Sequence, residues 1–330
     1  MKHIVVTDTH LGLYGASDLW HSISIELFQD IRKTGKKTGI RSILHCGDFF
    51  HNRRETNTKT MDAAQHIVST LLHDFNFNIV IGNHDAYFKN KLFPNSLQTL
   101  KGEMNVRIIS EAKVLPEDKN IIMCPWSGDL SGMPTGKYVF GHFEINGFLM
   151  NSSYRCKTGI DKSTLEAHRH VFSGHFHTPS TKSNITYLGS PYGQTWHDVN
   201  ATRGYYIFDS DTGKLDFIEF ENAPKFIVVG SENDIDEEQV KGNFVKLLFQ
   251  KDYGHINNQK IVDGVLSKKP ISLIPDFSQA NFMGTEERQE SEDLKIMDHN
   301  DIVREYVDKL ELPDHIKKQT LIGFMEKLMV

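Results

Sequence analysis

The sequence predicts an α+β fold, arranged as a four-layer α/β architecture in which a two-sheet β-sandwich is flanked by helices. Three observations lead to this prediction. Short apolar runs alternate with stretches of helical spacing over the first hundred residues. Strand-like runs then follow one another with few helices between them, and the character of the chain changes near residue 224. That change predicts a separate small module after the main domain.

The first hundred residues predict the order strand–helix–strand–helix–strand. Buried strands are expected at 3–7, 41–46 and 78–81. The helix at 17–37 has apolar residues at Leu19, Ile23, Leu27 and Ile31, and another helix is expected at 58–75. A βαβαβ order is typical of a parallel sheet covered on both faces. Further strands, which predict the second half of the sandwich, are expected at 106–109, 120–124, 137–140, 170–173, 185–188, 204–208 and 215–220.

The C-terminal third predicts three further parts. Strands at 226–229, 244–249 and 271–274 with a helix at 257–267 form a small α+β module. A polar, acidic stretch predicts a linker, and two amphipathic helical patterns follow at 298–310 and 314–329. The expected boundaries are 1–222 for the main domain, 223–276 for the module, 277–295 for the linker and 296–330 for the helical tail.

Composition excludes several classes of protein. No apolar run approaches the roughly 20 residues of a membrane span, and the N-terminal segment becomes acidic at Asp8, unlike a signal peptide. Cys46, Cys124 and Cys156 are far apart, which excludes a disulfide scaffold and a cysteine-only zinc site and fits a reducing cytoplasm. The net charge of -6 disfavours a protein that coats nucleic acid. Residues 1–220 hold 23 basic and 22 acidic side chains, so a nucleic-acid site would be local and lie there.

Seventeen histidines prompt the question of whether they cluster with carboxylates. Polar clusters follow five expected strands, and four of the clusters begin with glycine, which would let the backbone turn sharply. Ligands bind beyond the carboxyl ends of the strands in open α/β sheets. Carboxylates and imidazoles suit Mn²⁺, Fe²⁺ or Zn²⁺, and two adjacent metals clamp both oxygens of a phosphoryl displacement. The clusters are Asp8-Thr9-His10, Gly47-Asp48-Phe49-Phe50-His51, Gly82-Asn83-His84-Asp85, Gly141-His142 and Gly174-His175-Phe176-His177.

Each cluster by itself also has an ordinary structural explanation. Asp8-x-His10 could be a polar loop, Asp48 a turn carboxylate and His142 a core histidine. Asn83-His84-Asp85 could be an Asx turn with a helix cap. His175-x-His177, placed in a strand, would direct both rings to one face, which favours a metal site. The joint occurrence of the clusters, each after an apolar run, favours the metal site over these separate explanations.

The ordered set DxH, GDxxH, GNHD, GH and GHxH resembles the calcineurin-like metallophosphoesterases. Within them, GDFFH and GNHD resemble the SbcD-like DNA double-strand-break repair nucleases and lack the GDxxDRG and GNHE of protein phosphatases. The phrases VFGHFEINGF (139–148), FSGHFH (172–177) and YLGSP (187–191) look most like the T-even phage members of that branch. The similarity is strong to about residue 210 and only architectural beyond it.

The resemblance implies residue roles by motif position. Asp8, His10, Asp48 and His177 would hold one divalent metal. Asp48, Asn83, His142 and His175 would hold the second, with Asp48 bridging. His84 would protonate the leaving oxygen or stabilise charge, and His51 is the other candidate for that role. Mn²⁺ is the expected metal, with Mg²⁺ as the alternative.

The resemblance also implies a function and partners. The chain would be the nuclease subunit, a 3′→5′ double-strand exonuclease and single-strand endonuclease, of a DNA repair and recombination complex with an SMC-like ABC ATPase. The module would cap the DNA, the tail helices would bind the ATPase, and the helices at 17–37 and 58–75 would form a homodimer in the cytoplasm, that of the bacterial host for a phage protein. Local positive charge for DNA contact is expected from residues beside the metal motifs, namely Arg53, Arg54, Lys59, Lys89, Lys91, Arg155 and Lys157.

Two rival functions stay open at the level of the sequence. A calcineurin-like phosphatase or phosphodiesterase for small phosphate esters would use the same metals, although the second motif and the helical tail speak against it. A noncatalytic scaffold for the ATPase would need none of the metal ligands, and the complete set therefore disfavours it.

Overall fold

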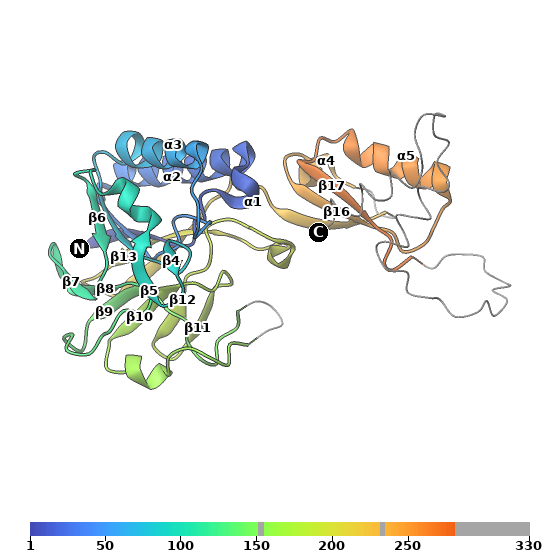
Figure 1. Ribbon diagram of the computed structural model, residues 1–330. Coiled ribbons are helices and arrows are strands. Elements are labelled where there is room, and N and C mark those ends of the chain that lie inside the picture. Colours follow the sequence, from blue (N-terminus) through green and yellow to red (C-terminus); the bar gives the residue numbers. More distant parts are fainter. Residues whose placement is uncertain (151–154, 232–234, 281–330) are drawn as a thin grey trace, which may run out of the picture. The chain divides into compact units, whose positions relative to one another are not determined.

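The computed structural model describes residues 1–150, 155–231 and 235–280 (Figure 1). Within them, the first sheet has the strand order β14-β13-β1-β2-β3-β6. Four strands are parallel, namely β1 (Lys2–Val6), β2 (Ser42–His45), β3 (Asn76–Val80) and β6 (Val106–Ile109). The hairpin of β13 (Gly204–Asp209) and β14 (Lys214–Glu219) joins this sheet antiparallel to β1. These strands are confirmed close to the ranges expected from the sequence.

Two helices cover one face of this sheet (Figure 1). Helix α2 (Asp18–Thr38) buries Ile23, Leu27 and Ile31 at helical spacing and ends at Gly39, whose positive φ of 75° suits glycine. Helix α3 (Thr58–Gln65) begins at Asn57, whose side chain accepts the N–H of Thr60. It continues as a π-helix over His66–Leu71, so the helix expected to reach residue 75 ends four residues earlier. The chain needs those residues to turn into β3.

The second sheet packs against the other face of the first. Its order is β11-β12-β10-β9-β8-β7, and β12, β10, β9 and β8 are parallel. Val5, Leu44 and Val80 of the first sheet pack against Phe140 and Phe172 of the second. The fold class, a two-sheet sandwich with flanking helices, is confirmed. The strands are β7 (Lys113–Leu115), β8 (Asp118–Cys124), β9 (Tyr138–His142), β10 (His170–Gly174), β11 (Ser180–Lys182) and β12 (Ile185–Tyr187).

Several short elements were not expected from the sequence. The hairpin of β4 (Ala86–Phe88) and β5 (Lys91–Asn95) follows the GNHD motif directly. Strands of three to five residues carry too little periodicity to be recognised when their side chains are partly exposed. The other short elements are α1 (Leu13–Ala16), α4 (Glu237–Val240), β7, β11 and the 3₁₀ turns Ser96–Leu100, Lys162–Leu165 and Trp196–Asp198.

After residue 225 the chain forms a three-stranded parallel sheet with its own core. The strands are β15 (Phe226–Gly230), β16 (Phe244–Leu248) and β17 (Ser272–Asp276), and α5 (His255–Leu266) packs on them through Val265. The tail patterns at 298–310 and 314–329, and most of the linker expected at 277–295, lie outside the described residues. No helix within the described ranges is long and apolar enough to cross a membrane.

Candidate metal centre

The five polar clusters meet where β1, β2, β3, β9 and β10 end. Backbone bonds tie the first two loops together, since the N–H of Asp8 donates to Gly47 O and that of His10 to Asp48 O, each at 3.0 Å. Asp8, Asp48 and His142 are buried almost completely. The expected convergence of the clusters is therefore present in the structure.

The first group of candidate ligands is Asp8, His10 and His177. The Nε2 atoms of the two imidazoles are 3.1 Å apart. Asp8 Oδ1 lies 3.9 Å from Nε2 of His10 and 3.8 Å from Nε2 of His177. Asp8 Oδ1 and the two Nε2 atoms are thus close enough together to ligate one metal ion.

The second group is Asp48, His142 and His175, with Asn83 among them. Asn83 Oδ1 is 2.8 Å from both His142 Nε2 and His175 Nδ1. Asp48 Oδ2 lies 3.3 Å from His142 Nε2 and 3.7 Å from Nε2 of His10 in the first group. Asp48 Oδ2 therefore lies within 3.7 Å of an imidazole nitrogen in each group.

The expectation that His175 and His177 lie in a strand with both rings on one face was wrong. Strand β10 ends at Gly174, and His175 has a left-handed φ of 90°. The chain turns there, so His175 joins the second group and His177 the first. Because His175 has a left-handed backbone conformation, the short motif at residues 174–177 supplies one histidine to each group.

The donor set fits two divalent cations. Two ligand atoms about 2.1 Å from one ion are roughly 3.0–3.4 Å apart at bond angles between 90° and tetrahedral. The spacings of 2.8–3.9 Å above span that range. Imidazole nitrogen and carboxylate or amide oxygen, with no thiolate, suit Mn²⁺, Fe²⁺ or Zn²⁺.

The electrostatics favour cation binding. Burial opposes ionisation of Asp48, but the imidazoles of His142, His10 and His84 hold the pKa of its carboxyl well below the usual range. Burial lowers the pKa of His142, yet the charge of Asp48 outweighs it and raises that pKa to about 9. A divalent cation beside Asp48 would replace this proton as the balancing charge.

Three other imidazoles of the ligand groups, those of His10, His175 and His177, are neutral at pH 7. Burial lowers the pKa of His175 to about 3 and that of His177 to about 4, and it brings the pKa of His10 well below its usual range. Neutral imidazole is the form that ligates metals. Burial also raises the pKa of the Asp8 carboxyl to about 7.

The glycines of the motifs are required mainly because neighbouring atoms leave no room for a Cβ, and less because the backbone turns there. A Cβ on Gly82 would lie 2.2 Å from both the backbone N and Oδ1 of Asp48, and one on Gly174 would lie 2.1 Å from Thr7 Oγ1. Among the four motif glycines, Gly47, Gly82, Gly141 and Gly174, only Gly47 has a positive φ, at 93°. The expectation that each glycine allows a sharp turn therefore holds for Gly47 alone. Among the candidate ligands themselves, left-handed φ occurs at Asp8, His10, Asp48 and His175.

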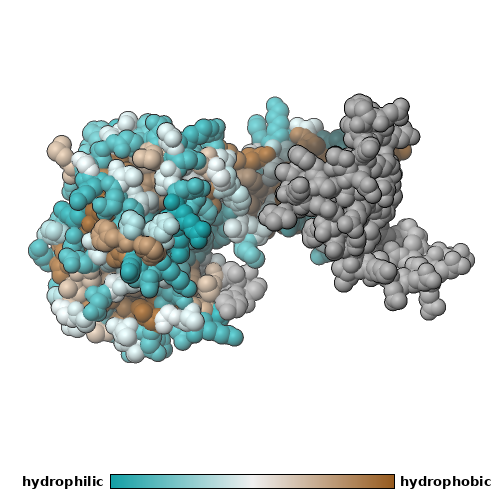
Figure 2. All heavy atoms as spheres, viewed as in Figure 1, coloured by the Kyte–Doolittle hydropathy of each residue, from teal (hydrophilic) through white to brown (hydrophobic). Residues whose placement is uncertain are grey.

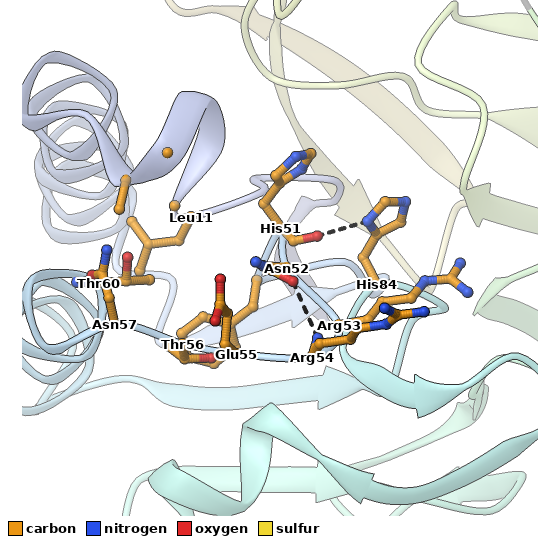
Figure 3. A pocket seen from close by; sticks show the side chains of 14 residues that line it. Leu11, His51, Asn52, Arg53, Arg54, Glu55, Thr56, Asn57, Thr60 and His84 are labelled. Atoms are coloured by element: carbon orange, nitrogen blue, oxygen red, sulfur yellow. Dashed lines mark hydrogen bonds between the residues drawn. The ribbon is translucent and has the colours of Figure 1, made fainter. Parts of the chain in front are cut away.

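His84 and His51 lie against the first group. The backbone N–H of His84 donates to Asp48 Oδ1 at 2.7 Å. Its Nδ1 is 2.7 Å from His51 O, so Nδ1 carries a proton, and Nε2 lies on the far side of the ring (Figure 3). The ring of His84 lies 4.8 Å from that of His10, and His51 Nδ1 is 3.3 Å from His10 Nδ1. His10, His51 and His84 form a third group that could hold a cation.

Some residues around the centre were not singled out from the sequence. Asp85 is buried and its carboxylate accepts the N–H groups of Asp48, Phe50 and Gly82 at 2.9–3.0 Å, so no helix cap forms at this motif. Trp126 packs against His175, with ring centroids 5.0 Å apart. Asp85 belongs to the quoted GNHD motif, whereas nothing in the local sequence indicated Trp126.

The basic residues expected to contact DNA fall into different settings. Arg53 and Arg54 line a cavity of 570 Å³ together with His51 and His84 (Figure 3). Lys59 instead forms an exposed ion pair with Asp18 at 2.8 Å. Lys89 and Lys91 lie on the β4–β5 hairpin, and Arg155 and Lys157 are exposed in the loop that bonds Glu144 through Cys156 and Thr158.

Comparison with known proteins adds independent findings. A family model, the calcineurin-like phosphoesterase superfamily domain, matches residues 1–213. Exonuclease subunit 1 of enterobacteria phage T4 is 32% identical over 229 residues, which cover 66% of this chain and 67% of that protein. A solved archaeal phosphodiesterase covers 67% of this chain and 100% of its own at 14% identity and a TM-score of 0.34. A dimetal phosphatase from Danio rerio covers 63% and 91% at 12% identity and a TM-score of 0.38.

Proposed function

Since the chain belongs to the calcineurin-like phosphoesterase superfamily, and is therefore a metal-dependent phosphoesterase, we propose that it is a two-metal DNA nuclease. The observation that carries the proposal is the pair of ligand groups that share Asp48 beside a cavity with two arginines. The similarity to a phage exonuclease subunit supports DNA as the substrate.

The proposed ligands follow from the two groups. Asp8, His10, Asp48 and His177 would hold one cation, and Asp48, Asn83, His142 and His175 the other. Mn²⁺ is the proposed metal and Mg²⁺ the alternative, since carboxylate and amide oxygens suit both ions and the imidazoles favour Mn²⁺. When bound, such a pair neutralises charge on the scissile phosphate and activates the attacking water.

The side chains beside the cations would complete the hydrolysis. The oxygen of water bonds to phosphorus as the bond from phosphorus to the leaving sugar oxygen breaks, and the proton that the water loses passes to solvent. His84 would act as the imidazolium: its Nδ1–H donates to the carbonyl of His51, and the proton of its Nε2–H passes to the leaving oxygen and is restored from solvent. Burial lowers the pKa of His51, so it would stabilise charge as a neutral hydrogen-bonding group. Arg53 and Arg54 would pair with backbone phosphates.

The same proposal extends to an assembly. The phage relative is named as a subunit, which supports a partner for this chain. We assign that role to an SMC-like ABC ATPase bound by residues 296–330, on the amphipathic pattern of that segment. The module at 223–276 would cap the DNA, and α2 and α3 would form a homodimer. The activities would be 3′→5′ exonuclease on duplex ends and endonuclease on single strands.

The test compares His84→Asn with the wild-type chain on end-labelled linear duplex DNA in Mn²⁺. Cleavage should fall by about 10²-fold or more, because the proton donor is lost, while metal content by mass spectrometry stays unchanged. His73→Asn is the matched control, since His73 is exposed and precedes the N-terminal end of β3, whereas the metal centre follows the C-terminal end of that strand. Loss of metal in His84→Asn would instead make His84 a ligand, as the third group allows.

A wild-type chain that hydrolyses bis(p-nitrophenyl) phosphate but leaves every DNA substrate intact would contradict the nuclease proposal. The alternative, a phosphodiesterase or phosphatase for small phosphate esters, would then replace it. A chain that binds no metal and hydrolyses neither substrate would contradict both.

A further inference from the structure

The β4–β5 hairpin exposes three aromatic side chains within seven residues. Tyr87, Phe88 and Phe93 are 46%, 45% and 53% exposed. The rings of Tyr87 and Phe88 lie 4.8 Å apart, edge to face. In Figure 2 a strip of apolar side chains lies over β4 and β5 among hydrophilic ones. Clusters of exposed apolar side chains often mark a surface that binds a ligand or a partner.

The hairpin is fixed to the metal centre at both of its ends. At its base, Ser96 donates to Asp85 O through its backbone N–H at 2.9 Å and its hydroxyl at 3.2 Å. At its tip, the indole N–H of Trp126 donates to Lys89 O at 2.9 Å. Trp126 in turn packs on His175 of the second ligand group. A ligand held on the hairpin would therefore be held at a defined place beside the centre.

The charge of this segment is opposite to that of the chain. Residues 86–102 contain Lys89, Lys91 and Lys101 and no acidic residue, in a chain of net charge -6. Among the described residues neither Lys89 nor Lys91 pairs with a carboxylate, and the Lys91 ammonium lies 5.9 Å from the ring centre of Phe88. Arg53 and Arg54 line the same cavity as His84. Exposed aromatic rings can stack on flat bases, and the lysine and arginine side chains can attract phosphates. The two together suit a polyanion whose bases are unpaired.

We infer that the hairpin is a stacking platform for the unpaired bases of a DNA strand that enters the metal centre. This inference rests on the proposed nuclease function and adds a substrate preference to it. Every base offers a π-face when unpaired, so exposed aromatic rings bind single strands with little sequence preference. A fully paired duplex offers such faces only at its ends. The platform should therefore favour single-stranded and frayed DNA over blunt, stable duplex.

The experiment measures binding of two fluorescein-labelled DNAs in EDTA by anisotropy. One DNA is oligothymidylate and the other a fully paired, blunt-ended duplex of two separate strands. The variant Y87A/F88A/F93A is compared with the wild-type full chain, and with Phe217→Ala as the matched control. Phe217 is 44% exposed on β14, in the strand at the edge of the first sheet. A second variant, Y87W/F88W/F93W, keeps the aromatic faces.

The triple alanine variant should lose about tenfold or more in affinity for oligothymidylate, with little change for the duplex. Phe217→Ala and the tryptophan variant should bind both as the wild type does. Hydrolysis of bis(p-nitrophenyl) phosphate in Mn²⁺ should be the same in all variants, because the platform holds no ligand of the centre.

An equal loss on both DNAs, or no loss on either, would overturn the inference and leave the nuclease proposal intact. So would a triple alanine variant that becomes monomeric in sedimentation while its affinity for oligothymidylate is unchanged, since the patch would then join two copies of the chain. A wild-type chain that binds neither DNA yet hydrolyses the small ester would instead contradict the proposed function itself.

Discussion

The carboxylate of Asp85 offers the sharpest test of how the candidate metal centre is held in place. Its Oδ2 accepts the N–H groups of Asp48 and Gly82, and its Oδ1 accepts that of Phe50. Asp85 thus clamps the loop after β2 to the loop after β3. The substitution Asp85→Asn keeps the size of the side chain and removes one acceptor.

The magnitude follows from counting hydrogen bonds. The asparagine Oδ1 can keep the two bonds to Asp48 and Gly82, but its NH₂ group then faces the N–H of Phe50, another donor. An unsatisfied buried donor costs about 1–3 kcal/mol, and the opposed donors push the loop away. For a domain of this size, in which 1 kcal/mol shifts the melting temperature by about 2–4 °C, that temperature should fall by roughly 2–12 °C. Because Asp48 moves with that loop, affinity for Mn²⁺ should fall about 10–100-fold.

Thermal unfolding of the metal-free chain and calorimetric titration with Mn²⁺ measure the two effects separately. Asp118→Asn is the control, since Asp118 is also buried and bonds His3 and the N–H of Asn120, away from the centre. It should lower the melting temperature without changing affinity for Mn²⁺. An Asp85→Asn chain that melts and binds Mn²⁺ as the wild type does would refute the clamp.

Two further outcomes are expected. Gly82→Ala should reduce Mn²⁺ affinity and DNA cleavage by tenfold or more in a folded chain, because its Cβ would lie 2.2 Å from Asp48 N; unchanged metal content by mass spectrometry would contradict this. Burial lowers the pKa of His3, so the stability gained by keeping it neutral is complete above its unfolded pKa of about 6.5 and is lost as pH falls below that value. The urea midpoint should therefore fall between pH 7 and 5 less steeply in His3→Gln than in wild type, and equal slopes would count against this assignment.

The metal motifs were predictable because each can be recognised from a few neighbouring residues. Residue types such as Asp8-x-His10 and GNHD follow buried runs at strand ends, and parallel strands bring such ends to one edge of a sheet. The helix at 17–37 was predictable for the same kind of reason, because apolar spacing alone sets the buried face.

Local reasoning failed where the backbone departs from regular structure. The left-handed φ of His175 divides His175 and His177 between two groups, and no periodicity contains it. Trp126 acquires its role only through partners more than thirty residues away, the carbonyl of Lys89 and the ring of His175.

The sequence by itself therefore determined the chemistry of this protein: which imidazoles and carboxylates are present, that they follow strands, and that no thiolate accompanies them. The family resemblance of the motifs already implied two ligand sets that share Asp48. The tertiary structure alone decided the distances within these sets, the clamp by which Asp85 joins two loops, and the places where a glycine leaves no room for a methyl group. The physical reason is that composition and periodicity act over a few neighbouring residues, whereas a shared ligand depends on ångström-scale distances between strands that are remote in the chain.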